Sequence, residues 1–285
     1  MKEKGREQAE TCTARLGLGM ARVAVVGNAS RDVVDGGAPT PGGCPEFAAA
    51  ALRRLGHEGQ IVTRFAPADA RLFEDLGPGV TVLSAASTSG FALDYAGDER
   101  EMAVTGLGDS WRPEDAAALE ADVEWVHAAP LLRSEFPAAT LAAFASGRSL
   151  SLDGQGLVRV PAVGRLDEDA AFDPAVLEPV TALKLSEHEA GIVAGGDFDR
   201  TTAEQLGVPE VLLTLGSRGA VVFADGRETH VADAEPVPGV HTTGAGDTFM
   251  VAYAVARIEG VDPVDAARAA TRLVGELLRE RRRAR

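Results

Sequence analysis

The residues best suited to chemistry lie near the C-terminal end of the chain. Gly244, Ala245 and Gly246 lead directly into a helix that we expect to begin near Asp247. The backbone N–H groups at a helix start have no partner within the helix, so they can hold an anion such as phosphate. Asp247 would then stand beside that phosphate, able to take a proton from an attacking hydroxyl. A structural alternative stays open, in which Asp247 only caps a helix after a glycine turn.

Short apolar runs alternate with helical segments along most of the chain. This order of strand, glycine turn, helix and strand predicts a mainly parallel α/β sheet. We expect strands over 22–27, 59–63, 125–128, 150–152, 182–185 and 211–216, a hairpin over 220–231, and helices over 46–55, 138–145, 247–258 and 263–278.

One stretch, from Ser89 to Thr105, departs from this alternation. Phe91, Leu93 and Tyr95 fall on one side of an extended segment, and a turn is expected over 96–99. Such a period of two predicts an antiparallel hairpin inserted in the α/β chain. The hairpin could cover an active site as a lid, or it could be an ordinary surface element, because periodicity alone does not separate the two.

Composition limits the classes of partner. The chain has 285 residues, is 45% hydrophobic and carries a net charge of -15, which argues against nucleic acid or an anionic membrane. Two cysteines are too few for a disulfide scaffold. Residues 1–20 are charged and lack an apolar core, so we expect a disordered extension before one domain over 21–285, in a cytoplasmic protein. The basic run 279–285 is expected to be a solvated tail.

Five segments, in the same order, resemble the motifs of the ribokinase-like (PfkB) carbohydrate kinases. They are 27–32, 42–56, 184–189, 213–220 and 242–249, and the resemblance spans about residues 22 to 278. It implies an α/β fold with a mainly parallel central sheet, helices on both faces and a small β lid near 33–41 and 88–105. It further implies an ATP-dependent kinase whose acceptor is a hydroxyl of a small polyol or sugar.

The resemblance also implies a role for each matched residue. Asp247 would be the general base, and Gly244, Ala245 and Gly246 would bind the developing negative charge. Thr214, Gly216, Gly219 and Ser186 would hold the nucleotide, and Glu189 would organise Mg²⁺ through water. Asp32, Gly42 and Gly43 would bind the acceptor. Lid hairpins in this family often pair in dimers, so the resemblance leaves a homodimer open.

Three positions depart from the family pattern. Phe47 stands where sugar-binding members usually carry Asn, which removes an amide that would grip sugar hydroxyls. Ser186 replaces the Asn of the magnesium motif, and His241 stands where Asp is frequent. The segment from Asp153 to Arg159 resembles the myo-inositol-kinase-like branch, which implies that vicinal hydroxyls meet Asp32 together with Asp153 or Arg159.

Two alternatives remain. A nucleoside kinase of the same fold could use Phe47 to stack on a base or pack along a ribose. A non-catalytic binding protein could keep the fold without turnover, and the residues at positions 47 and 186 favour it. The intact loop from Gly244 to Asp247 and the presence of Glu189 favour an enzyme.

Overall fold

A large, mainly parallel sheet forms the centre of the molecule. The computed structural model describes residues 22–283 apart from 78, 97–98, 232–236, 238–239 and 241. Within these residues, nine strands lie in the order β14-β13-β12-β11-β9-β8-β1-β4-β5, and only the pairings β12–β13 and β13–β14 are antiparallel. The strands are β1 (Arg22–Asn28), β4 (Gln60–Phe65), β5 (Val80–Ser84), β8 (Val123–Ala128), β9 (Ser149–Asp153), β11 (Ala182–Ser186), β12 (Glu210–Thr214), β13 (Ala220–Ala224) and β14 (Arg227–Val231).

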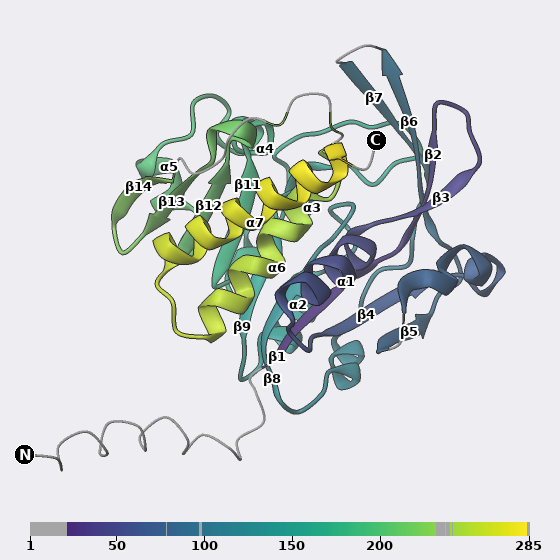
Figure 1. Cartoon of the computed structure of the whole chain (residues 1–285), viewed down its shortest axis with the longest axis horizontal. Helices are drawn as coiled ribbons and strands as arrows, with labels where there is room; N and C mark the ends of the chain where they lie inside the picture. Colours follow the sequence, from purple (N-terminus) through teal and green to yellow (C-terminus); the bar gives the residue numbers. More distant parts are fainter. Residues whose placement is uncertain are drawn as a thin grey trace, which may run out of the picture.

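Helices cover both faces of this sheet, as the sequence predicts. α1 (Cys44–Leu55), α6 (Ala245–Ile258) and α7 (Pro263–Arg283) pack on one face (Figure 1). α2 (Ala138–Ala145), α3 (Gln155–Val158), α4 (Glu187–Ala194) and α5 (Arg200–Gln205) contribute to the core on the other face. Shorter 3₁₀ turns lie at η1 (Pro67–Leu76), η2 (Pro113–Ala118), η3 (Pro174–Leu177) and η4 (Gly216–Arg218).

Strand β1 shows why the apolar runs become buried strands. Val23 and Val25 pack with α1 and α6, whereas Ala24 and Val26 pack into the core of the opposite face. Successive side chains of a strand point to opposite faces, so a strand covered by helices on both sides must be apolar at every position. Because neighbouring strands from β12 to β5 run in the same direction, their carboxyl ends lie at one edge of the sheet.

A second sheet stands at one corner of the molecule (Figure 1). It contains β10 (Gly164–Arg165), β7 (Glu99–Gly106), β6 (Ser89–Ala96), β2 (Ser30–Val34) and β3 (Pro39–Gly42), in that order. The predicted hairpin is present as β6 and β7, with Leu93 opposite Met102. The second sheet is larger than expected, because β2 and β3 pair with each other and β2 pairs in parallel with β6.

The C-terminal end differs from the prediction. α7 continues to Arg283, so the run expected as a tail is helical as far as Arg283, although Arg282 and Arg283 are exposed and residues 284–285 lie outside the described residues. Arg281 donates to the carbonyl oxygen of Thr243, 2.9 Å away, which fixes this end of the helix against the loop before α6. Residues 1–20 and His241 lie outside the described residues.

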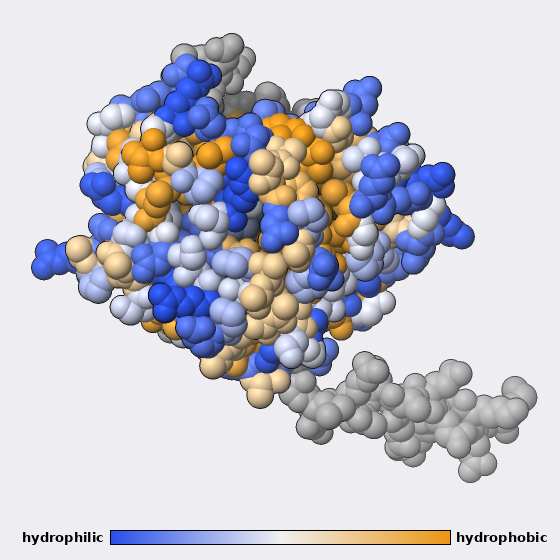
Figure 2. All heavy atoms as spheres, turned by 180° about the vertical axis from the view of Figure 1, so that it is seen from behind, coloured by the Kyte–Doolittle hydropathy of each residue, from blue (hydrophilic) through white to orange (hydrophobic). Residues whose placement is uncertain are grey.

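Polar and apolar residues are mixed over the surface of the described chain. On the side opposite to the view of Figure 1, hydrophobic residues gather in the upper half among polar ones (Figure 2). No helix in the described ranges is long and apolar enough to cross a membrane.

Candidate active site

One cleft of about 690 Å³ lies where β1, β9, β11 and β12 end and α6 begins. Ligands of open α/β sheets bind at this carboxyl edge. The cleft brings together every predicted site residue except Gly42: Asp32, Gly43, Phe47, Asp153, Arg159, Ser186, Glu189, Thr214, Gly216, Gly219, Gly244, Ala245, Gly246 and Asp247. Gly42 does not line the cleft but lies against the side chain of Asp32, because a Cβ at Gly42 would come within 2.1 Å of Asp32 Oδ2.

The loop before α6 requires glycine at position 244 for two reasons. Gly244 has a φ of 78°, in the left-handed region that other residues rarely adopt. A Cβ there would also lie 2.1 Å from Cδ1 of Phe47, whose ring packs on this loop. The Arg281 guanidinium lies 6.0 Å from the centre of the same ring. Phe47 therefore lines the cleft and supports the loop that begins α6.

Asp247 occupies the first turn of α6 and faces a crowded set of charges. Loss of water contact in the cleft raises the pKa of its carboxyl, and repulsion from Asp153 raises it further. A hydrogen bond from the Cys44 thiol and attraction from Lys184 and Arg159 oppose this rise in the pKa. A carboxylate in such a setting is more basic than an exposed one, which suits a proton acceptor.

Lys184 contacts several residues of the site, although the sequence motifs gave it no role within the segment 184–189. Its Nζ lies 3.3 Å from each oxygen of Asp153 and 3.7 Å from Oε2 of Glu189. Burial lowers the pKa of the Lys184 ammonium, but attraction by Asp153, Glu189 and Asp247 outweighs burial and raises it. The signal available in the sequence was a lysine within the apolar run of β11, because a lysine is rarely buried unless it is paired.

The side of the cleft formed by Asp32 and Arg159, where the sequence predicts the acceptor, has a polar wall. Asp32 Oδ1 and Arg159 Nε are buried atoms with no hydrogen-bond partner within the described chain. Burial raises the pKa of the Asp32 carboxyl, while a hydrogen bond from Ser30 and attraction by Arg159 act against that rise. Buried polar atoms normally have hydrogen-bond partners. The carboxylate oxygen of Asp32 and the N–H of Arg159 therefore indicate that a polar ligand binds here.

Beside Asp32, the second sheet gives the cleft an apolar surface. Phe91, Leu93 and Met102 of the second sheet line it together with Leu131. Phe91, Leu93 and Leu131 belong to one buried cluster that joins the second sheet to the loop after β8. This arrangement lets the second sheet exclude water from one side of a bound molecule.

The other end of the cleft runs along α7. Thr271, Val274, Gly275 and Leu278 line it, together with Val237. On the opposite side, Gly216 and Gly219 adopt φ values of 59° and 86°, and Thr214 donates to the carbonyl oxygen of Leu185. An apolar slot with a glycine in its floor can accept a flat ring, such as the base of a nucleotide.

Glu189 has the position and chemistry to assist a magnesium ion. Its Oε2 accepts from the Ser186 N–H at 2.8 Å, and the Ser186 hydroxyl accepts from the Glu189 N–H, so the pair forms a capping box at the start of α4. No group of three or more His, Cys, Asp or Glu side chains in the described part of the chain could hold a metal alone. Mg²⁺ commonly binds through one or two carboxylates, water and substrate phosphates, and these residues fit that mode.

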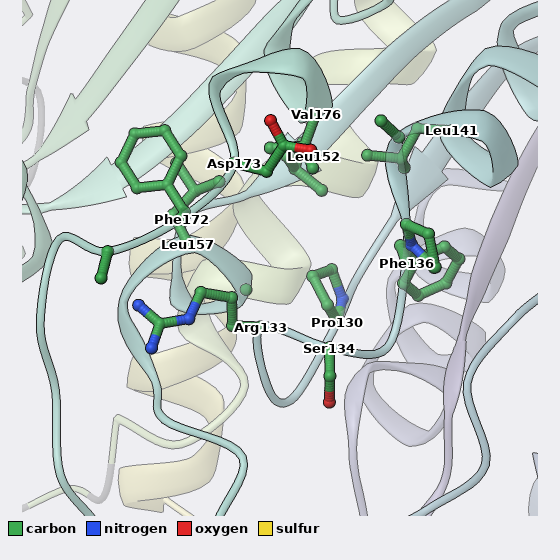
Figure 3. Close-up of a pocket in the computed structure, with 14 residues that line it drawn as sticks. Pro130, Arg133, Ser134, Phe136, Leu141, Leu152, Leu157, Phe172, Asp173 and Val176 are labelled. Carbon is green, nitrogen blue, oxygen red and sulfur yellow. The ribbon is translucent and has the colours of Figure 1, made fainter.

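A second cavity of about 410 Å³ lies on the other side of the turn that joins β9 to α3. Its walls are mainly apolar, with Phe136, Leu141, Leu152, Leu157 and Phe172 around it (Figure 3). The charged groups on its wall already have protein partners. Arg133 forms an ion pair with Asp169, and Asp173 accepts from the Ala175 N–H. These groups leave little chemistry for a reactive site.

Comparison with known proteins agrees with this geometry. A model of the pfkB family carbohydrate kinases matches residues 109–281, more than half of the chain. The inositol 3-kinase of Zea mays is 33% identical over 126 residues, which are 42% of this chain and 31% of that protein. The chain spans only 15% to 32% of the length of the curated relatives it matches.

Solved structures match over nearly the whole chain. A pyrophosphate-dependent kinase in the ribokinase family, complexed with a pyrophosphate analog and myo-inositol, has a TM-score of 0.76 and 26% identity, covering 90% of this chain and 95% of that one. The Arabidopsis thaliana ribokinase complexed with ribose and ATP has a TM-score of 0.69 and 22% identity, covering 91% and 93%. These likenesses confirm the ribokinase-like fold that the sequence predicts.

Proposed function

Because the chain belongs to the pfkB family of carbohydrate kinases, we propose that it transfers a phosphoryl group from ATP to a hydroxyl of a small cyclic polyol or sugar. The observation that carries the proposal is the position of Asp247. It follows the small-residue loop Gly244–Gly246 at the start of α6, in the same cleft as Asp32, Asp153 and Arg159. This arrangement supports Asp247 as a proton acceptor between a helix start that can hold phosphate and a wall suited to hydroxyls.

The residues suggest how the transfer would proceed. Asp247 takes the proton of the acceptor hydroxyl as the new oxygen–phosphorus bond forms, and the bond to the leaving diphosphate breaks in line. The N–H groups at the start of α6 hold the phosphoryl oxygens as charge develops on them. Phe91 and Leu93 of the second sheet keep out water, which would otherwise compete as acceptor.

The polar wall supports a cyclic polyol as acceptor. Asp32 and Asp153 can accept from hydroxyls while Arg159 donates to them, a pattern that fits neighbouring hydroxyls on one ring. The 26%-identical structure bound to myo-inositol and the similarity to an inositol 3-kinase support the same class. Phe47 offers less support for a nucleoside, because its ring packs against Gly244.

The slot along α7 supports ATP as the donor. Val237, Val274 and Leu278 could contact an adenine ring, whereas pyrophosphate has no group that fills an apolar slot. Glu189 would hold Mg²⁺ through water, and the ion would supply positive charge beside the phosphate oxygens. Pyrophosphate is the second candidate donor, because the similar structure with myo-inositol is a pyrophosphate-dependent kinase.

The experiment that tests the proposal is a panel of acceptors with each donor. Inositols, hexoses, pentoses and nucleosides are incubated with MgATP or magnesium pyrophosphate, and the phosphorylated product is measured directly. We expect one acceptor class to be phosphorylated, and Asp247→Asn to lower kcat by about 10³-fold or more, as the loss of a general base requires.

A matched control is available in the next helix. Asp265 occupies the first turn of α7, as Asp247 does in α6, but its side chain is 57% exposed to solvent. Asp265→Asn should leave kcat within about twofold, because it removes only a surface charge. Binding of ATP without phosphorylation of any acceptor would instead favour the non-catalytic interpretation.

A further inference from the structure

Lys184 stands where four parts of the site meet. It projects from β11 toward Asp153 at the end of β9, Glu189 in α4 and Gly246 in α6. A Cβ built at Gly246 would lie 3.2 Å from Lys184 Nζ, so the ammonium is beside the helix start that the proposed function assigns to phosphate. Lys184 therefore lies beside the proposed acceptor residue Asp153, the candidate magnesium residue Glu189 and the helix start at Gly246.

The contacts of Lys184 are loose for a buried ion pair. Both Asp153 oxygens lie 3.3 Å from Nζ, whereas hydrogen bonds between an ammonium and a carboxylate are usually about 2.7–2.9 Å long. Glu189 Oε2 is 3.7 Å away, beyond hydrogen-bond distance. One ammonium thus faces the carboxylates of Asp153, Glu189 and Asp247, all of which attract it. This excess of negative charge would repel a phosphate unless Lys184 can turn toward it.

Arg159 also attracts Asp247, and its Nε lies 4.0 Å from Glu168 Oε1; two further cations near the helix start have closer partners. Arg281 donates to the Thr243 carbonyl oxygen, and Arg218 pairs with Glu187 at the surface of the cleft. Lys184 differs from them because its partner, Asp153, also belongs to the wall assigned to the acceptor. A bound hydroxyl would donate to Asp153 and weaken the hold of this carboxylate on Lys184.

Accepting the proposed function, we infer that Lys184 contacts the terminal phosphate of the donor, and that its pairing with Asp153 makes donor binding depend on the acceptor. Without an acceptor, Asp153 holds the ammonium. With an acceptor, the hydroxyls engage Asp153 and Lys184 donates hydrogen bonds to the phosphate. Lys184 keeps its proton throughout, and the hydroxyl proton goes to Asp247. The coupling is reciprocal, so the donor also tightens binding of the acceptor.

The inference can be tested by binding alone. Affinities for magnesium pyrophosphate and for the magnesium complex of β,γ-imido-ATP are measured by calorimetry, without acceptor, on the full chain. Asp153→Asn should tighten binding of at least one of these probes about fivefold or more, because it frees Lys184. Lys184→Met should weaken it about tenfold or more. In the double variant, the gain from Asp153→Asn should disappear.

The double variant also separates this mechanism from a general effect of charge. If Asp153→Asn tightens binding by the same factor in the wild-type chain and in the Lys184→Met variant, the carboxylate acts on the phosphate directly and the inference is wrong. A simple comparison remains if Lys184→Met alone fails to fold, since it leaves Asp153 and Glu189 without their buried partner. Asp153→Asn should then bind about fiftyfold more tightly than the double variant, because the fivefold gain and the tenfold loss combine, and equal affinities would overturn the inference.

Failure of the inference is distinguishable from failure of the proposed function. If the variants and the wild type bind the probes equally, and the wild type phosphorylates an acceptor, Lys184 has no part in donor binding but the proposed kinase activity stands. Loss of binding in Lys184→Met, with no acceptor phosphorylated by the wild type, would keep the lysine as a phosphate contact and reject the kinase. Binding of neither probe by the wild type or by Asp153→Asn would overturn both. Lys184→Arg, which keeps the charge, should retain most of the affinity.

Discussion

The cleft and the second cavity share one wall but differ in how their charges are satisfied. Asp153 at the end of β9 and Arg159 just after α3 line the cleft, whereas Leu152 of β9 and Leu157 of α3 line the second cavity. In the cleft, Arg159 Nε has no hydrogen-bond partner in the described chain and lies 4.0 Å from Glu168 Oε1, while Arg133 beside the second cavity donates a hydrogen bond to Asp169. The difference shows that available space does not identify the functional site. Buried polar atoms without a hydrogen-bond partner favour the cleft, but they are not specific to it, because His57, Arg64 and His127 carry such atoms outside its lining.

The largest difference between the cleft and the second cavity is expected when the loop Gly244–Gly246 at the start of α6 is changed. Gly244→Ala should lower kcat/KM by about 10²–10³-fold, because its Cβ would collide with Phe47 and displace the N–H groups that the proposed function assigns to phosphate. Steady-state kinetics on the acceptor found in the panel would measure this loss.

Gly260→Ala is the matched control for backbone strain. Gly260 has a φ of 84°, close to the 78° of Gly244, but no atom lies within 4 Å of the position that a Cβ would occupy there. We expect it to cost about 1–2 kcal/mol of stability with kcat/KM nearly unchanged. Equal losses of activity in the two variants would show that strain, and not the contact with Phe47, causes the effect.

A smaller effect is expected at the wall between the two cavities. Arg159→Met should raise the KM for the acceptor about 10- to 100-fold and leave the KM for the donor within about twofold, because the lost hydrogen bonds reach only the acceptor. Arg133→Met, on the other side of the same turn, should leave both values nearly unchanged. An equal rise in the KM for the donor would contradict the assignment of Arg159 to the acceptor side.

The smallest effect on activity is expected in the second cavity. Leu141→Ala should lower the free energy of unfolding by about 3 kcal/mol, because Leu141 is a buried core side chain, and change kcat/KM by less than about twofold. Urea denaturation and kinetics on the same preparation would measure both quantities. A fall in kcat/KM with unchanged stability would assign a functional role to the second cavity.

The sequence predicts those parts of the molecule that are local in the chain. The apolar run of β1 and the amphipathic pattern of α1 are recognisable because one buried segment determines each of them. The small-residue loop before Asp247 is recognisable because its residues are consecutive in the chain, lead directly into a helix and match a family motif as one short segment. β2 and β3 are harder to predict, since Pro39, Pro41 and nearby glycines resemble a loop.

The parts that the sequence does not predict depend on contacts between distant segments. Lys184 acquires its position from Asp153 and Glu189, which come from a different strand and helix. Phe47 contacts Gly244, which is almost 200 residues away in the chain. The sequence shows that Phe replaces the usual Asn, but it does not predict this contact. The basic end of α7 resembles a tail because its arginines are polar, although Arg281 binds the Thr243 carbonyl oxygen.

Strand β3 has a consequence for association between molecules. An exposed edge strand offers its free N–H and C=O groups to any other extended chain, which favours edge-to-edge aggregation. Pro39 and Pro41 occupy two of the four positions of β3, so half of its residues have no N–H to offer. The second sheet can therefore extend beside the acceptor wall, with β3 as its outer strand, without presenting a good template for another strand.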